Sequence, residues 1–287
     1  MHFGQTLKKI RQNRALTQLD VCDGIMKQGT YSRIENGQLD IGAAELAKIV
    51  ERLNISLNEF LFIHQNYEAT PRQQLINDYI NIELTIASQL KEKRKAVALY
   101  LQKHRDVEIE TILYSYDTMI ALMEQKDMDV VRSIAEKVWA RLQKLDYWYM
   151  TDLEILNATI MYFPFETAVE VANTAIARID AYTHFEKDLT YLKLYFKVNL
   201  SYLYLEEKRY EECLRLLETA QNQYSKLLTY QTLGFILTRI IICKHHLGMA
   251  IDEDWNKLSM LRQLFDDEEV FDVLLEELQL TIPHFKI

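Results

Sequence analysis

The sequence predicts an all-α protein, in which a small helix-turn-helix domain precedes a larger domain of repeated helix pairs. Two observations support this prediction. Five of the seven glycines lie in the first 42 residues, where short helices need tight turns, whereas the rest of the chain is nearly free of helix-breaking residues. From Arg72 to Leu280 the apolar residues recur with a helical period, and no segment shows the alternation or the turn dipeptides of hairpin strands.

The composition is that of a globular protein. The 287 residues are 49% hydrophobic and 26% charged, which suits one large or two ordinary domains. No window approaches about 18 uninterrupted apolar residues, and the first residues lead directly into a lysine-rich helix, so we expect a cytoplasmic protein without a membrane segment. The chain has three cysteines, which are Cys22, Cys213 and Cys243. They lie too far apart in the sequence to indicate a disulfide framework or a zinc site, and we expect neither a metal nor a cofactor.

The net charge of −9 is unevenly distributed. Up to Gly37 the chain has six Lys or Arg residues and three Asp or Glu residues, an excess of about three positive charges, and the rest of the chain is strongly acidic. This distribution suits a small head that contacts DNA and a body that the DNA phosphates repel.

Residues 16–37 carry the clearest functional pattern, because they indicate two short helices joined by a tight turn. Thr17 suits the N-cap of the first helix. We expect one face of each helix to enter a common core that comprises Leu19, Val21, Cys22, Ile25, Met26, Tyr31 and Ile34. The polar face of the second helix then points outward, as in a recognition helix that enters the major groove of DNA.

Nine residues are the predicted DNA contacts: Lys8, Arg11, Arg14, Thr17, Gln18, Lys27, Gln28, Thr30 and Arg33. Gln28 and Arg33 are expected to read base edges, with Thr30 nearby. The expected phosphate contacts are Gln18, Lys8, Arg11 and Arg14. Spacing alone would suit any small helical hairpin with solvated polar faces equally well.

The residue types in this pattern resemble a known family. Thr17-Gln18 opens the first helix and Ser32-Arg33-Ile34-Glu35-Asn36-Gly37 closes the second, which resembles the phage-repressor (XRE) type of DNA-binding domain. The distance from Thr17 to Glu35 is one residue shorter than in the commonest repressor form, and this spacing resembles the Rgg/GadR/MutR regulators of Gram-positive bacteria. The segment 53–61 is similar to the end of the DNA-binding domain in that family.

A domain boundary is predicted at the polar run that precedes Pro71. Thr70 and Pro71 suit the N-cap and the first position of a helix. We therefore expect a DNA-binding domain over 1–64, a linker over 65–71 and a helical-repeat domain over 72–287. In the first domain, further helices are expected over 43–53 and 57–63. The helices expected in the second domain are 72–88, 89–104, 107–125, 129–144, 148–161, 164–182, 186–206, 208–225, 228–247, 251–265 and 267–280.

The second domain also resembles known proteins. The segment 207–217 resembles the start of the second helix of a tetratricopeptide (TPR) repeat, with Cys213 at a position where a small residue lets two helices approach closely. Segments 144–153 and 157–165 extend the resemblance to Rgg and to the wider peptide-responsive (RRNPP) group. This resemblance implies a right-handed TPR-like domain that forms a homodimer and binds a short hydrophobic signalling peptide on its concave face, as in quorum sensing by peptide pheromones.

Seven residues are the predicted peptide contacts, because they are polar or aromatic and lie at helical spacing on the expected inner helices: Tyr114, Asn157, Tyr195, Asn199, Tyr202, Phe235 and Arg239. An asparagine amide offers donors and an acceptor to any peptide backbone, so Asn157 and Asn199 are expected to clamp it. Arg239 is expected to pair with a peptide carboxylate. The alternative for each residue is a polar side chain satisfied between helices.

A dimer is predicted because two heads are needed to read a two-fold symmetric promoter element on double-stranded DNA. The last helix offers an apolar stripe for this dimer contact, which comprises Val270, Phe271, Leu274, Leu275, Leu278 and Leu280. Burial of the helix within its own subunit would explain part of this stripe.

Catalysis finds no support, because the sequence has no glycine-rich phosphate loop, no nucleophile elbow and no HExxH motif. His245 and His246 point about 100° apart on a helix and are expected to be solvated rather than metal ligands. The predicted function is therefore a transcriptional regulator controlled by a peptide. The alternative keeps the DNA-binding domain and makes the repeats a docking platform for a partner protein; a helical-repeat enzyme is a weaker third hypothesis.

Overall fold

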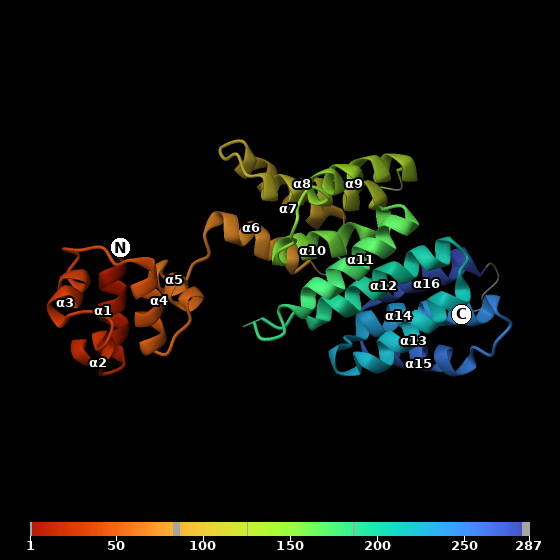
Figure 1. The fold of residues 1–287 in the computed structure, drawn as a ribbon. Helices are drawn as coiled ribbons and strands as arrows, with labels where there is room; N and C mark the ends of the chain where they lie inside the picture. The colour runs from red at the N-terminus through yellow and green to blue at the C-terminus, as the bar shows by residue number, and fades with distance from the viewer. Residues whose placement is uncertain (1, 83–86, 125, 186, 283–287) are drawn as a thin grey trace. The chain divides into compact units, whose positions relative to one another are not determined.

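The computed structural model describes residues 2–82, 87–124, 126–185 and 187–282, and every regular element within these ranges is a helix (Figure 1). The predicted all-α fold is confirmed. The chain divides into two compact units, Met1–Gln74 and Leu75–Ile287. None of the described helices is both long and apolar enough to cross a membrane.

The first unit contains five short helices whose apolar faces meet in one core. They are α1 (Phe3–Asn13), α2 (Gln18–Cys22), α3 (Gln28–Glu35), α4 (Ala43–Arg52) and α5 (Leu57–His64). Thr17 caps α2 as predicted, since its side chain accepts from the Asp20 amide while the Asp20 carboxylate accepts from the Thr17 amide. The core includes Val21, Cys22, Tyr31 and Ile34. The prediction that Leu19 belongs to it is wrong, because α2 is so short that Leu19 lies on its outer face, 55% exposed.

Gly4 allows α1 to lie directly against the end of α3. A Cβ atom at Gly4 would lie 1.7 Å from the carbonyl oxygen of Ile34 and 3.1 Å from the Cα atom of Glu35. Both are backbone atoms of α3, so they cannot move aside as a side chain could. Only glycine fits at this contact.

The second unit begins within α6 (Pro71–Ile80), which starts as predicted with Thr70 as the N-cap, since the Gln73 amide donates to Thr70 Oγ1. The helix ends at Ile80 rather than at 88, and the next expected helix, 89–104, is found as α7 (Ala87–Leu101). Residues 83–86, over which α6 was expected to continue, lie outside the described residues. The other helices of this unit follow in order: α8 (Val107–Met123), α9 (Met128–Leu142), α10 (Met150–Thr159), η1 (Ile160–Tyr162), α11 (Phe165–Asp180), α12 (Thr190–Glu206), α13 (Tyr210–Gln223), η2 (Ser225–Leu227), α14 (Tyr230–His246), α15 (Asp252–Leu264) and α16 (Glu268–Thr281).

From α7 to α15, consecutive helices of the second unit contact each other, as expected for repeated helix pairs (Figure 1). Helix α12 contacts α10, α11, α13 and α14, and α14 in turn contacts α15 and α16. Cys213 is fully buried, and its Sγ donates to the Ser201 carbonyl oxygen 3.4 Å away, so a small side chain does stand at the close approach of α12 and α13.

The apolar stripe of the last helix is used within its own subunit. Five of its six predicted residues are buried in a cluster that α16 forms with α14 and α15: Val270, Phe271, Leu274, Leu275 and Leu278. Only Leu280 is exposed, at 77%. The prediction that this stripe is the dimer surface is therefore wrong, because α16 needs it to cover α14.

The tryptophans and the His245–His246 pair were expected to have no role in ligand binding, and their contacts are as follows. Trp139 packs against Trp148 and Phe163. His245 and His246 are exposed near the end of α14, where the His246 ring stacks on Tyr210. Among the described residues, no group of His, Cys, Asp and Glu is arranged to hold a metal ion.

Candidate functional sites

Helix α3 presents its polar side to solvent. Lys27, Gln28 and Arg33 are exposed and Thr30 is half-buried, whereas Tyr31 faces the core. Lys27 is the backbone N-cap of α3, with no capping bond from its side chain. The exposed set therefore begins at the first turn of α3, which is the part of a recognition helix that meets base edges.

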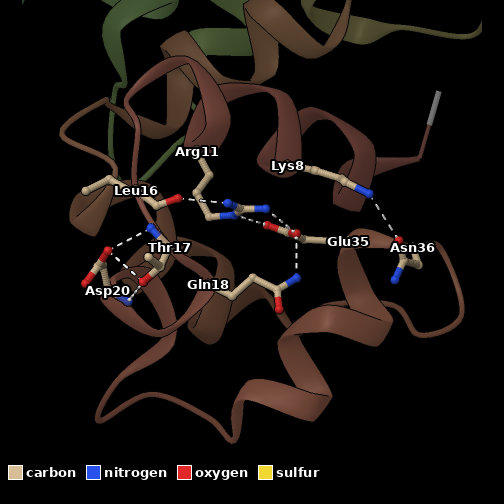
Figure 2. Close-up of polar contacts among 8 residues, drawn as sticks. All are labelled: Lys8, Arg11, Leu16, Thr17, Gln18, Asp20, Glu35 and Asn36. Carbon is tan, nitrogen blue, oxygen red and sulfur yellow. Dashed lines mark hydrogen bonds and ion pairs between the residues drawn. The ribbon is translucent and has the colours of Figure 1, made fainter.

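Arg11 and Gln18 form a polar cluster around the buried carboxylate of Glu35 (Figure 2). Arg11 Nε donates to Glu35 Oε1 at 2.6 Å and Arg11 Nη2 donates to Glu35 Oε2 at 2.9 Å. Arg11 Nη1 donates to the Leu16 carbonyl oxygen at 2.8 Å, and Gln18 Nε2 donates to Glu35 Oε2 at 2.9 Å. Burial by itself raises the pKa of Glu35, but the hydrogen bonds from Arg11 and Gln18 outweigh it, so the pKa lies below its ordinary value.

This cluster corrects one predicted DNA contact. All three nitrogen atoms of the Arg11 guanidinium are bound within the protein, and the side chain is only 11% exposed. Arg11 therefore positions the end of α3 and does not hold a phosphate. Gln18 keeps its amide oxygen available, since only its Nε2 is used in this cluster.

The remaining predicted phosphate contacts lie at the edges of the first unit. Lys8 Nζ is 3.3 Å from Asn36 Oδ1, and Arg14 Nη2 donates to the Asn54 carbonyl oxygen at 3.1 Å, both in exposed positions. Thr17 Oγ1 donates to Asp20 Oδ2 at 2.7 Å, as part of the cap of α2. Bonds as exposed as those of Lys8 and Arg14 can exchange for phosphate at little cost, so the phosphate roles of both residues stay predictions.

The second unit contains a cavity of about 590 Å³. Its lining comes from the end of α6 and the residues after it, from α10 with η1, from the segment before α12, and from α12 and α14: Ile80, Asn81, Ile82, Asn157, Met161, Lys187, Tyr191, Tyr195, Val198, Asn199, Thr229, Gln231, Thr232, Phe235 and Arg239. Five of the seven predicted peptide contacts are in this set. The structure thus brings Asn157, Tyr195, Asn199, Phe235 and Arg239 together, as helical spacing predicted.

Asn157 and Asn199 contact each other on the cavity wall. Asn199 Nδ2 donates to the Asn157 carbonyl oxygen at 2.8 Å and lies 3.2 Å from Asn157 Oδ1. These bonds orient both amides and leave the Asn199 Oδ1 acceptor and the Asn157 Nδ2 donor for other partners. One acceptor and one donor side by side match the N–H and C=O groups of a peptide backbone.

Two predicted peptide contacts lie away from the cavity. Tyr114 is on α8, where its hydroxyl donates to Glu110 Oε1 at 3.2 Å and Lys137 Nζ lies 5.3 Å from the ring centroid. Tyr202 is on the same helix as Asn199 but one turn beyond the lining residues, and its ring lies 5.8 Å from the Arg239 guanidinium. Periodicity identified the correct face of α12 but not where along it the cavity ends, and α8 does not line the cavity at all.

Arg239 lines the cavity, but its predicted pairing with a peptide carboxylate does not fit its surroundings. Its Nε and Nη2 bind Glu277 Oε1 and Oε2 at 2.7 and 3.3 Å, and the residue is 4% exposed. Its Nη1 donates to the Val198 carbonyl oxygen at 2.5 Å and to Ser201 Oγ at 3.0 Å. Arg239 thus joins α12, α14 and α16, and Glu277 already balances its charge.

Sequence reasoning missed the other ten lining residues named above, among them Lys187, Tyr191, the N-cap of α14 (Thr229) and two residues of its first turn (Gln231 and Thr232). Tyr191 precedes Tyr195 by one turn, and Gln231 and Thr232 precede Phe235 by one turn, so extending the same stripes would have found them. Lys187 precedes Tyr191 by four residues within the helix expected over 186–206, so the same stripe would have included it, although the structure places it in the connection before α12. Its Nζ is 3.6 Å from Oε1 of the buried Glu154, which also accepts a hydrogen bond from the Tyr191 hydroxyl. Burial raises the pKa of Glu154.

Comparison with known proteins agrees with both parts of this description. Residues 7–60 match the helix-turn-helix family. No curated protein matches the chain. Among solved structures, the chain is similar to Bacillus thuringiensis PlcR in complex with the peptide PapR7 and DNA, with 19% identity, a TM-score of 0.70, and coverage of 95% of this chain and 98% of PlcR.

Two further structures show the same fold. A proposed transcriptional regulator from Listeria monocytogenes EGD-e has 16% identity and a TM-score of 0.71, with 97% of each chain covered. The SHP pheromone receptor Rgg2 of Streptococcus dysgalactiae has 15% identity and a TM-score of 0.66, with 97% of this chain and 100% of Rgg2 covered. The predicted fold class, a helix-turn-helix domain followed by a TPR-like helical domain, is confirmed. Membership of the Rgg subfamily stays a prediction, because PlcR is as similar as Rgg2.

Proposed function

We propose that this protein is a cytoplasmic transcriptional regulator that binds DNA through α3 and is controlled by a short, largely apolar peptide bound in the cavity of the second unit. The observation that carries the proposal is the cavity itself, in which two adjacent asparagine amides lie among aromatic and apolar side chains. A peptide of this kind would act as a secreted signal, as in quorum sensing.

The DNA-binding part rests on the exposed side of α3 and on the helix-turn-helix match. Gln28 and Arg33 are proposed to reach base edges, because glutamine and arginine form bidentate hydrogen bonds to adenine and guanine. Lys8, Arg14, Gln18 and Lys27 are proposed to contact phosphates, together with the backbone around Thr17. We propose a homodimer, since two heads are needed to engage a two-fold symmetric element in successive major grooves.

The peptide-binding part rests on the size and chemistry of the cavity. A volume of about 590 Å³ lies within the range of small-ligand sites, roughly 300–1,000 Å³. A short peptide loses conformational entropy on binding, so its site must supply oriented hydrogen bonds on a rigid surface. Asn157 and Asn199 offer such bonds from two different helices, and Tyr195 and Phe235 offer apolar contacts.

The proposal is tested with the full-length protein in two steps. DNA fragments that the protein selects from its own genome are measured by fluorescence anisotropy, with and without synthetic peptides encoded by short reading frames near its gene. We expect saturable peptide binding and a change in DNA affinity or in transcription from the selected promoter. Selective DNA binding without any saturable peptide would remove the peptide from the proposal and favour a partner protein; the absence of selective DNA binding would overturn the regulator.

A further inference from the structure

Two ion pairs border the cavity, and both present their positive end to it. Lys187 and Arg239 are lining residues, while their partners Glu154 and Glu277 are not. No carboxylate occurs among the described residues that line the cavity. The charged side chains that line the cavity are thus positive only, and this arrangement favours a negatively charged group and disfavours an ammonium group.

Of the two cations, only Lys187 has N–H donors available for a ligand. Arg239 is 4% exposed and makes four hydrogen bonds within the protein. The Lys187 side chain is 43% exposed, and its Nζ lies 3.6 Å from Glu154 Oε1, which is beyond normal hydrogen-bond length. The Glu154 carboxylate is held by the Tyr191 hydroxyl and is only 9% exposed. The ammonium group of Lys187 can therefore turn its protons toward a ligand while Glu154 stays in place.

We propose that Lys187 binds the C-terminal carboxylate of the peptide, and that the peptide therefore lies in the cavity with its carboxyl end at the connection between α11 and α12. This inference rests on the proposed function and adds a direction to it. Lys187 Nζ lies 5.3 Å from the centre of the Tyr191 ring, so Tyr191 marks its level on α12. Tyr191 and Asn199 are eight residues apart on this helix, a rise of about 12 Å. An extended peptide advances about 3.3 Å per residue, so one that runs along α12 would meet the asparagine pair about four residues before its carboxylate.

The test uses the full-length protein and a defined probe. Seven-residue peptides made only of Ala, Val, Leu, Ile, Phe and Gly are pooled as free acids and as C-terminal amides, with an isotope label on the amides. Peptides retained by the protein are counted by mass spectrometry. Because the pool has no acidic side chains, any preference for the acids reports the terminal carboxylate. We expect the wild-type protein to retain at least about ten times more acid than amide.

Two variants locate the carboxylate site. Lys187→Met should bring the ratio of acid to amide close to one, and Lys187→Arg should keep most of the preference. Lys193→Met is the matched control, because it removes the same charge from α12 but Lys193 pairs with Asp180 and does not line the cavity. Its ratio should equal that of the wild type. Circular dichroism verifies that each variant is folded.

The other outcomes distinguish a failure of the carboxylate site at Lys187 from a failure of peptide binding itself. If the wild-type protein retains acids and amides equally, or if Lys187→Met keeps the full preference, the carboxylate is not bound at Lys187 and the inference is overturned while peptide binding stands. If the wild-type protein retains neither form, the peptide-binding function fails and the inference fails with it.

Discussion

Arg11 and Glu35 form a two-point ion pair that ties the first helix to the end of the helix expected to read DNA (Figure 2). The Glu35 side chain is fully buried, so its charge depends on Arg11 and Gln18 for compensation. A surface ion pair contributes little to stability, but removing one partner of a buried pair leaves an uncompensated charge.

We therefore expect Arg11→Met to destabilise the first unit by about 3–5 kcal/mol. The free energy of unfolding of this unit is measured in the full-length protein by hydrogen exchange of the amides of α1 and α3. Lys9→Met is the control, since Lys9 is exposed on the same helix. Equal effects of the two substitutions would show that the pair does not stabilise the unit.

The same pair predicts how stability depends on pH. The pKa of Glu35 is lowered in the folded protein, so its contribution is complete above the unfolded value, about 4.3, and is lost as the pH falls through the folded value. Glu35→Gln should lower stability at pH 7 and make the first unit less sensitive to acid below about pH 4. Glu51→Gln, at an exposed position on α4, serves as the control. An unchanged acid profile in Glu35→Gln would contradict the prediction.

Substitutions on the DNA side should separate base reading from phosphate binding. Arg33→Ala is expected to cost about 1–3 kcal/mol of discrimination between the selected site and a random duplex. Lys8→Ala should weaken binding to the selected site and to the random duplex alike. It should also reduce the slope of log affinity against log salt concentration by about one. Titrations at several salt concentrations distinguish the two, with Lys48→Ala on the exposed side of α4 as the control. If Arg33→Ala kept both affinity and selectivity, α3 would not be the recognition helix.

In the cavity, Asn199→Ala should weaken binding of a selected peptide by about 1–3 kcal/mol, because it removes an acceptor and leaves Asn157 unoriented. Folding without peptide should change little. Fluorescence anisotropy with the labelled peptide measures the first effect and circular dichroism the second, with the exposed Asn222→Ala as the control. Wild-type affinity in well-folded Asn199→Ala and Asn157→Ala proteins would exclude both residues from the site.

The full-length protein is expected to be a dimer at micromolar concentration, as light scattering would show. Because the stripe of α16 is buried, the contact must use other apolar residues, and α15 exposes Met260 at 61% and Leu264 at 75%. Leu264→Asp should shift the mass toward the monomer, whereas Leu57→Asp on α5 should not. A monomer in the wild-type protein would contradict the dimer.

Patterns with a fixed spacing were sufficient to predict the helices and one face of each. The capped start of α2 and the lining residues of α12 and α14 follow from residue types at helical intervals. Helix ends were less predictable: α12 begins at Thr190 and not at 186, because Asp188 accepts from the Thr190 amide.

Partnerships between distant residues could not be predicted in this way. Arg11 and Arg239 have the residue type that binds phosphates and carboxylates, but their acidic partners lie 24 and 38 residues away in the sequence. Only the packing of α1 on α3 and of α14 on α16 shows that their charges are already used. Lys187 was missed for a different reason: it lies within the helix expected over 186–206, four residues before Tyr191, but the stripe of Tyr195 and Asn199 was not followed back that far.

The contact at Gly4 makes the orientation of α3 depend on a position outside the proposed DNA contacts. Any side chain there would push the Ile34 carbonyl outward and tilt α3 by lifting its last turn. Gln28 and Arg33 would then meet the groove at a different angle although neither had been altered. In the proposed regulator, a mutation at Gly4 would in this way abolish repression or activation at every promoter at once, and a genetic screen would mistake it for a change in the proposed recognition helix.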